Sequence, residues 1–144
     1  MTTVRHVLQA KGNQVYSVTP DTTVYDVLKV LAEKNIGAVL VMEGEKLVGV
    51  FSERDYARKI VLKGESSQNV KVKDVMTSVV ACVNPDQPIE ECMMLMTEKH
   101  VRHLPVMEND KLVGIISIGD VVKAVISDKE FTISQLHNYI TGRR

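Results

Sequence analysis

An internal repeat constrains the fold of this chain more than any other feature of its sequence. Shifting the sequence by 65 positions aligns residues 18–55 with residues 83–120 without a gap, and fourteen of the thirty-eight aligned pairs are identical. The match is densest near the end of each copy, where residues 46–52 meet residues 111–117. A duplication of this kind predicts two copies of one supersecondary unit.

Hydrophobic spacing predicts the same elements in both copies. Each copy has apolar residues at positions i, i+3, i+4 and i+7, which places them on one face of a helix. These residues are Val24, Val27, Leu28 and Leu31 in the first copy, and Ile89, Cys92, Met93 and Met96 in the second. Two apolar runs separated by a short polar turn follow each helix and predict a hairpin of paired strands, over residues 38–42 and 47–51 and over residues 104–107 and 112–116. A second helix is expected to begin at Ser52 and at Ser117.

Each copy therefore reads as strand, helix, strand, strand, helix. A unit of about 60 residues buries too little surface to be very stable alone. We therefore expect the two copies to pack sheet against sheet, with two equivalent clefts between them. Residues 4–8 also match residues 72–76, which places a short segment before each copy. The predicted boundaries are 1–64 for the first repeat, 65–71 for a linker, 72–129 for the second repeat and 130–144 for a C-terminal helical extension.

Both copies end on one motif: glycine, two apolar residues, serine, any two residues and aspartate, at residues 49–55 and 114–120. With the duplication and the order of elements, this motif makes the chain resemble the cystathionine β-synthase (CBS) domain family over nearly its whole length. The resemblance implies an α/β (α+β) fold of two pseudo-symmetric β-α-β-β-α repeats, with an extra C-terminal helix. It also implies a non-catalytic regulatory sensor that binds AMP, ADP, ATP, NAD or S-adenosylmethionine in the clefts and needs no cofactor.

The serine and aspartate of each motif are the candidate ribose-binding residues, namely Ser52, Asp55, Ser117 and Asp120. A carboxylate held at the start of a helix can accept hydrogen bonds from two neighbouring ribose hydroxyls, and the serine three residues earlier can reach ribose or phosphate. The same pattern is also a variant capping box, which only completes a helix. One residue can serve both purposes, so the two interpretations remain open.

The candidate phosphate-binding residues follow from the resemblance. Arg102 and His103 stand where family members often carry a basic pair, whereas the first copy has glycine and alanine at that place. Arg54 precedes Asp55 directly and can hold a phosphate in a bidentate fork, and Gly119 occupies the equivalent position in the second copy. Solvated surface charge is the alternative for both arginines.

An adenine ring would be enclosed by apolar side chains and read by main-chain groups. The candidates are Val15, Tyr16, Ile36, Gly37, Ala38, Val80, Ala81, Val101, Pro105 and Ile115. Core packing explains Ile36 and Val101 equally well, because apolar residues at the start of a strand are usually part of the core.

Three alternatives compete with a nucleotide sensor. The first is a structural dimerisation module whose clefts hold no physiological nucleotide. The second is a weak nucleotide hydrolase that uses Asp55 or Asp120, although the sequence has no nucleophile elbow and no phosphate-binding loop. The third is a metal site at His100 and His103, which a strand would point to opposite faces. We therefore predict neither catalysis nor a bound metal.

Composition narrows the class of partner. Eighteen basic and eighteen acidic residues cancel, so nothing predicts binding to nucleic acid. No apolar run is long enough to span a bilayer and no secretory signal is visible, which predicts a cytoplasmic protein with Cys82 and Cys92 as reduced thiols. We expect a homodimer, because exposed helices of one repeat pair can bury against those of another. We also expect a regulated protein partner, because the sequence shows no effector domain of its own.

Overall fold

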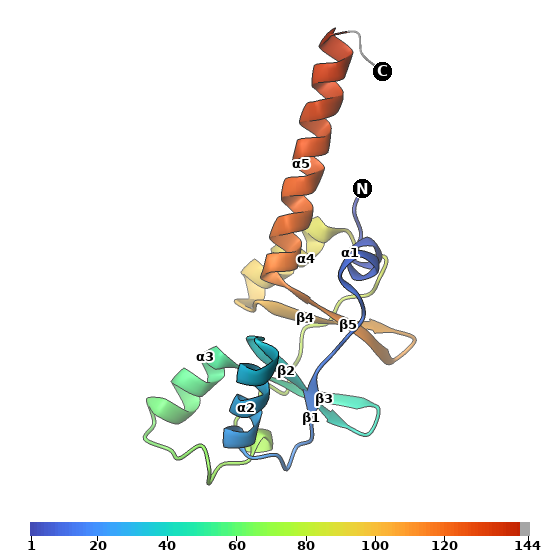
Figure 1. Ribbon diagram of the computed structural model, residues 1–144. Helices are drawn as coiled ribbons and strands as arrows, with labels where there is room; N and C mark the ends of the chain where they lie inside the picture. The colour runs from blue at the N-terminus through green and yellow to red at the C-terminus, as the bar shows by residue number, and fades with distance from the viewer. Residues whose placement is uncertain (142–144) are drawn as a thin grey trace. The chain divides into compact units, whose positions relative to one another are not determined.

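The computed structural model describes residues 1–141, which divide into two compact units (Figure 1). Unit 1 comprises Met1–Asn13, Cys82–Glu108 and the chain from Gly114 onward. Unit 2 comprises Gln14–Ala81 and Asn109–Val113. The boundaries of the sequence repeats therefore differ from the boundaries of the compact units. The segment that precedes the first repeat belongs to unit 1, with most of the second repeat.

Unit 2 is built on a three-stranded sheet in the order β1-β2-β3. Strand β1 (Ser17–Val18) runs parallel to β2 (Ala38–Glu43), which pairs antiparallel with β3 (Lys46–Ser52). The β2–β3 hairpin turns at Gly44, whose φ of 63° lies in the left-handed region that a tight two-residue hairpin favours. Helix α2 (Val24–Lys34) connects the parallel pair, as a parallel connection requires.

Helix α2 forms where its apolar spacing predicts. The Thr23 hydroxyl accepts a hydrogen bond from the Asp26 backbone at 3.2 Å and caps the first turn. Asn35 ends the helix in the left-handed conformation, with φ of 54°. The buried side of α2 joins the core of unit 2, which consists of Val24, Val27, Leu31, Val39, Val41, Phe51, Ile60 and Val72.

The helix expected after the first hairpin is irregular. One α-helical turn, α3 (Glu53–Asp55), continues directly as a π-helical segment, η1 (Tyr56–Val61). A π-helix places more residues in each turn than an α-helix does, so the apolar face shifts along it. Ile60 is buried, and Val61 next to it is half exposed. Unit 2 also contains the 3₁₀ turn η2 (Val72–Asp74), which the sequence repeat assigns to the second copy.

Unit 1 repeats the helix and hairpin of unit 2. Helix α4 (Ile89–Lys99) ends at His100, which adopts φ of 55° as Asn35 does in the other copy. Strands β4 (His103–Glu108) and β5 (Lys111–Ser117) form a two-stranded sheet. The opening strand predicted for this copy is reduced to a single parallel bridge between Val83 and Val106. The mixed α and β fold class predicted from the sequence is confirmed.

The C-terminal helix is continuous with the last helix of the second repeat. Helix α5 (Ile118–Thr141) packs against α4 near its start and then extends away from the other elements of unit 1 (Figure 1). No glycine or proline occurs between residues 120 and 141, so helix α5 continues from the second repeat through Thr141 without a break. The predicted extension includes residues 142–144, which lie outside the described residues. Among residues 1–141, no helix is long and apolar enough to cross a membrane.

Helix α1 (Val4–Lys11) completes unit 1 through a glycine of the repeat motif. A Cβ atom added at Gly114 would lie 2.8 Å from a methyl carbon of Leu8, so the glycine makes room for this side chain. In unit 2 a Cβ added at Gly49 would lie 2.8 Å from Cγ of Met76. Leu8 and Met76 are equivalent residues of the sequence repeat, so each motif glycine accommodates a segment that precedes the other copy.

Candidate functional site

The serine and aspartate of the second repeat stand at the junction of β5 and α5. The Asp120 Oδ2 atom accepts a hydrogen bond from the Ser117 backbone N–H at 2.9 Å. The Asp120 backbone N–H in turn donates to the Ser117 hydroxyl at 3.2 Å. These reciprocal bonds form the capping box that the sequence pattern predicts, and they fix the carboxylate at the first turn of α5.

A lysine from α1 also engages this carboxylate. The Lys11 ammonium lies 2.6 Å from Asp120 Oδ2 and donates a second hydrogen bond to the carbonyl of Ile115 at 3.0 Å. Burial raises the pKa of Asp120, but the hydrogen bonds from Lys11 and Ser117 and the charge of Lys11 together lower it below its ordinary value. Asp120 is therefore a fixed anion at neutral pH.

The first repeat builds a related arrangement inside unit 2. The Asp55 Oδ2 atom accepts hydrogen bonds from the Ser52 backbone at 2.9 Å and from the Ser52 hydroxyl at 3.1 Å. The Lys59 ammonium lies 3.4 Å from Asp55 Oδ1 and donates to the Val75 carbonyl at 2.7 Å. Each repeat thus holds its aspartate with a serine and pairs it with a lysine that also binds a main-chain carbonyl.

The residues predicted to contact phosphate lie beside these aspartates within their own units. The carbonyl of Arg102 accepts a hydrogen bond from the Ile118 backbone at 2.8 Å, which places Arg102 at the start of α5. The carbonyl of Gly37 accepts the equivalent bond from Glu53 at 3.0 Å. The Arg102 side chain is exposed, as a phosphate contact or a solvated charge would be.

The remaining phosphate candidates occupy the expected elements. His103 is the first residue of β4, and Arg54 lies inside α3 directly before Asp55. Gly119 is exposed in the first turn of α5, and its nearest side-chain atom is the Ser117 hydroxyl oxygen, 3.6 Å from an added Cβ. A Cβ at Gly119 would therefore make only an ordinary van der Waals contact.

The candidate adenine residues divide between the two units. Unit 2 contains Val15, Tyr16, Ile36, Gly37, Ala38, Val80 and Ala81, and unit 1 contains Val101, Pro105 and Ile115. The Tyr16 carbonyl accepts a hydrogen bond from the Leu40 backbone at 3.3 Å, and the Lys34 ammonium lies 5.3 Å from the centre of the Tyr16 ring. Ala38 and Pro105 are buried strand residues. The adenine pocket itself stays a prediction.

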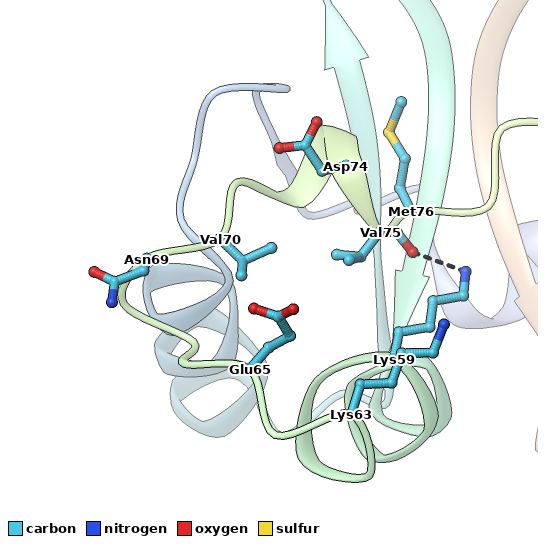
Figure 2. Close-up of a pocket in the computed structure, with 8 residues that line it drawn as sticks. All are labelled: Lys59, Lys63, Glu65, Asn69, Val70, Asp74, Val75 and Met76. Carbon is cyan, nitrogen blue, oxygen red and sulfur yellow. Dashed lines mark hydrogen bonds between the residues drawn. The ribbon is translucent and has the colours of Figure 1, made fainter.

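Unit 2 also contains a hollow of about 450 Å³, shown in Figure 2. It is lined by Lys59, Lys63, Glu65, Asn69, Val70, Asp74, Val75 and Met76. None of the residues predicted to bind a ligand lines it. Lys59 connects it to the candidate site, because the ammonium that binds the Val75 carbonyl at the edge of the hollow also pairs with Asp55.

His100 and Cys92 have structural explanations. His100 is the left-handed residue that ends α4, and among residues 1–141 no group of three or more histidine, cysteine, aspartate or glutamate residues could hold a metal ion. Burial, with smaller contributions from nearby glutamates, raises the pKa of the Cys92 thiol to about 11. The exposed Cys82 also has a raised pKa because of partial burial of its thiol.

Sequence reasoning missed the two lysines that pair with the aspartates. Lys59 was detectable, because it lies four residues after Asp55 and such pairs meet on a helix surface. Lys11 had no comparable signal, since 109 residues separate it from Asp120. Only the fold brings it to the second-repeat motif.

Comparisons with known proteins point to one family. The model of the CBS domain matches residues 4–62 and again residues 72–127. The CBS domain-containing protein CBSX3, mitochondrial, of Arabidopsis thaliana is 38% identical over an alignment of 150 residues, which covers 98% of this chain and 73% of that protein.

Solved structures give the same result. A protein with CBS domains from Burkholderia ambifaria MC40-6 superposes with a TM-score of 0.86 and 52% identity, covering 88% of this chain and 96% of the other. The CBS domain pair of protein MJ0100, solved in complex with 5′-methylthioadenosine and S-adenosyl-L-methionine, has a TM-score of 0.76 at 21% identity. It covers 86% of this chain and 99% of its own, and this likeness shows the fold alone.

Proposed function

This chain belongs to the CBS-domain family, and from that membership we propose that it is a non-catalytic regulatory module that binds an adenosine-containing ligand. The observation that carries the proposal is the repeated aspartate. Asp55 and Asp120 are both oriented by a serine at the start of a helix, and each is accompanied by a cation. A pair of ribose hydroxyls can donate to such a carboxylate.

The chemistry of the site favours binding over catalysis. A nucleotide hydrolase needs a base that accepts a proton from water at neutral pH. The pKa of Asp120 lies below its ordinary value, which makes this carboxylate a hydrogen-bond acceptor and a poor base. The Lys11 ammonium that pairs with it strengthens the same role.

The ligand class is an adenosyl compound, with AMP, ADP, ATP, NAD and S-adenosylmethionine as the candidates. Support comes from the MJ0100 domain pair, in which the same fold binds 5′-methylthioadenosine and S-adenosyl-L-methionine. Arg54, Arg102, His103 and Gly119 are the proposed phosphate contacts. The ten adenine candidates named from the sequence retain their proposed role.

The regulatory output would pass to another protein or through assembly. A ligand shifts the equilibrium between two conformations only by the difference in its affinity for them. To signal, the ligand must therefore favour a conformation in which the surface that contacts the partner is packed differently. We infer a homodimer, because the exposed second half of α5 carries a row of apolar side chains. We also propose a cytoplasmic location. The mitochondrion is the alternative, because the Arabidopsis relative is named as a mitochondrial protein.

Titration calorimetry tests the proposed site. The full chain should bind at least one of the five candidate ligands with micromolar affinity, and Asp55→Asn or Asp120→Asn should weaken binding at least about tenfold, because each removes the charged acceptor of the ribose hydroxyls. Asp110→Asn is the matched control, since Asp110 lies in the β4–β5 turn at φ of 62°, a conformation that asparagine also tolerates. Equal affinity in both site variants and the parent would refute the site.

Thermal melting separates a sensor from a purely structural dimerisation module. A ligand that binds only the folded chain raises the melting temperature by mass action. We expect at least one adenosyl compound to do so. No shift with any of the five compounds at millimolar concentration would favour the structural module.

A further inference from the structure

The second-repeat site already contains a cation that competes for the ribose-binding carboxylate. The Lys11 ammonium lies 2.6 Å from Asp120 Oδ2, the same oxygen that accepts the Ser117 backbone hydrogen bond. The pair is partly shielded from solvent, with side-chain exposures of 32% for Lys11 and 19% for Asp120. A ribose that donates one hydroxyl to each Asp120 oxygen therefore competes with the ammonium for Oδ2.

Displacement leaves the ammonium with one neutral partner. Lys11 would keep its hydrogen bond to the Ile115 carbonyl at 3.0 Å and lose its only carboxylate contact among the described residues. A partly shielded charge without a counter-ion is unfavourable, so a bound ligand gains affinity if it brings an anion within reach of this ammonium. The 5′-phosphate of a nucleotide is carried on the ribose itself and supplies that anion.

On the basis of the proposed function, we propose that Lys11 makes the second-repeat site selective for adenosyl ligands that carry a phosphate on the ribose. AMP and related nucleotides satisfy both Asp120 and Lys11. Adenosine and 5′-methylthioadenosine supply the ribose hydroxyls for Asp120 but leave the Lys11 ammonium without an anionic partner. Lys11 is thus a specificity-determining residue of this site.

The lysine side chain can act without moving its helix. Helix α1 is held at its other end, where the Thr2 hydroxyl donates to Asp128 at 2.6 Å and Arg5 pairs with Asp86 and Glu108 at 3.2 and 2.9 Å. Val4 and Leu8 are buried in unit 1. The flexible four-carbon side chain can therefore swing from Asp120 toward a phosphate while α1 stays in place.

The first repeat lacks an equivalent competitor. Lys59 lies in η1, which continues directly from α3 and Asp55, and it approaches Oδ1 at 3.4 Å, while both Ser52 hydrogen bonds fall on Oδ2. Its shorter contact, 2.7 Å, is with the Val75 carbonyl. The selectivity is therefore assigned to the second repeat alone.

Paired titrations of the full chain with AMP and with adenosine test this selectivity. Every protein in this experiment, including the parent, carries Asp55→Asn, so that the first repeat contributes little to binding. The parent should bind AMP at least about tenfold more tightly than adenosine. Lys11→Met should bind adenosine about fivefold more tightly than the parent does and should gain nothing for AMP, because it removes a cost of roughly 1 kcal/mol for the stranded charge.

Three further variants make the result decisive. Lys11→Arg should keep the preference of the parent, Lys11→Gln should repeat the effect of Lys11→Met, and Lys99→Met, which removes one exposed charge elsewhere in unit 1, should change neither affinity. Lys11→Gln also serves if Lys11→Met does not fold, as checked by circular dichroism. Unchanged or equally weakened affinities for both ligands in the Lys11 variants would overturn the selectivity and leave the binding site intact. A parent that binds neither compound nor any other adenosyl ligand would overturn the proposed function as well.

Discussion

Gly114 and Leu8 form a tight contact that the motif glycine makes possible. An added Cβ at Gly114 would lie 2.8 Å from one Leu8 methyl carbon and 3.0 Å from the other, well inside normal carbon–carbon contact. Leu8 is only 6% exposed, so it has little space into which it can retreat. The glycine is thus a packing requirement of α1 against the β5 strand.

Gly114→Ala should destabilise the protein by about 1–3 kcal/mol, because the added methyl group overpacks a filled core. Urea unfolding followed by circular dichroism measures this loss. The matched control is Gly119→Ala, where the nearest atom is 3.6 Å away and alanine favours the helix, so stability should be unchanged or slightly higher. The losses of Gly114→Ala and Leu8→Ala should add to more than the loss of the double variant. Equal stability of Gly114→Ala and the parent would contradict this account.

The aspartates were predictable from sequence, and their lysine partners were only partly so. Asp55 and Asp120 stand out because one motif occurs twice in register, and the capping geometry depends only on residues three positions apart. Lys59 follows the same local logic. Lys11 reaches Asp120 through tertiary packing, which residue spacing does not encode.

Helix α5 carries an exposed apolar face that runs along both of its halves. Five of its exposed apolar residues follow alternating steps of four and three positions, namely Val122, Ile126, Ile133, Leu136 and Ile140, with the polar Lys129 at the step between Ile126 and Ile133. Isoleucines 126, 133 and 140 occupy one heptad position, and Leu136 occupies the other. This combination favours pairing of two helices, so a second copy of α5 is the partner that fits it.

Leu136→Asp and Ile133→Asp should each convert a dimer into a monomer, because a buried carboxylate without a partner is costly at the helix seam. Light scattering coupled to size-exclusion chromatography measures the change. Ser134→Asp adds the same charge one residue away, outside the row, and should remain a dimer. A monomeric parent, or a dimer that tolerates both seam variants, would exclude α5 as the dimer contact.

Elements with strong periodicity were predicted well, and those that depend on tertiary pairing were not. Helices α2 and α4 and both hairpins occur where apolar spacing and turn residues indicate. The opening strand of the second copy is only the Val83–Val106 bridge, because a short strand forms only where a neighbour pairs with it. The π-helical segment η1 is also invisible to a periodicity of 3.6 residues.

At the scale of the molecule, the chain exchanges the segments that precede its repeats. Residues 1–13 belong to unit 1, with most of the second repeat, and residues 72–76 belong to unit 2, with the first. Val4 in α1 and Val72 in η2 are both fully buried in the unit they join. A repeat cut at its sequence boundary therefore lacks part of the core that its unit requires.

The fragment of residues 72–141 should fail to fold by itself, because it lacks Val4 and Leu8, whose burial contributes roughly 1.5–3 kcal/mol each in a unit that is already small. Adding the peptide of residues 1–13 in trans should restore helicity and a cooperative thermal transition, because α1 brings these side chains and the Lys11 partner of Asp120. A peptide with Leu8→Asp should not, since the added carboxylate would be buried at Gly114. Circular dichroism measures each case. Cooperative unfolding of the fragment without the peptide would show that α1 is dispensable for folding. The exchange of leading segments would then contribute little to the stability of unit 1.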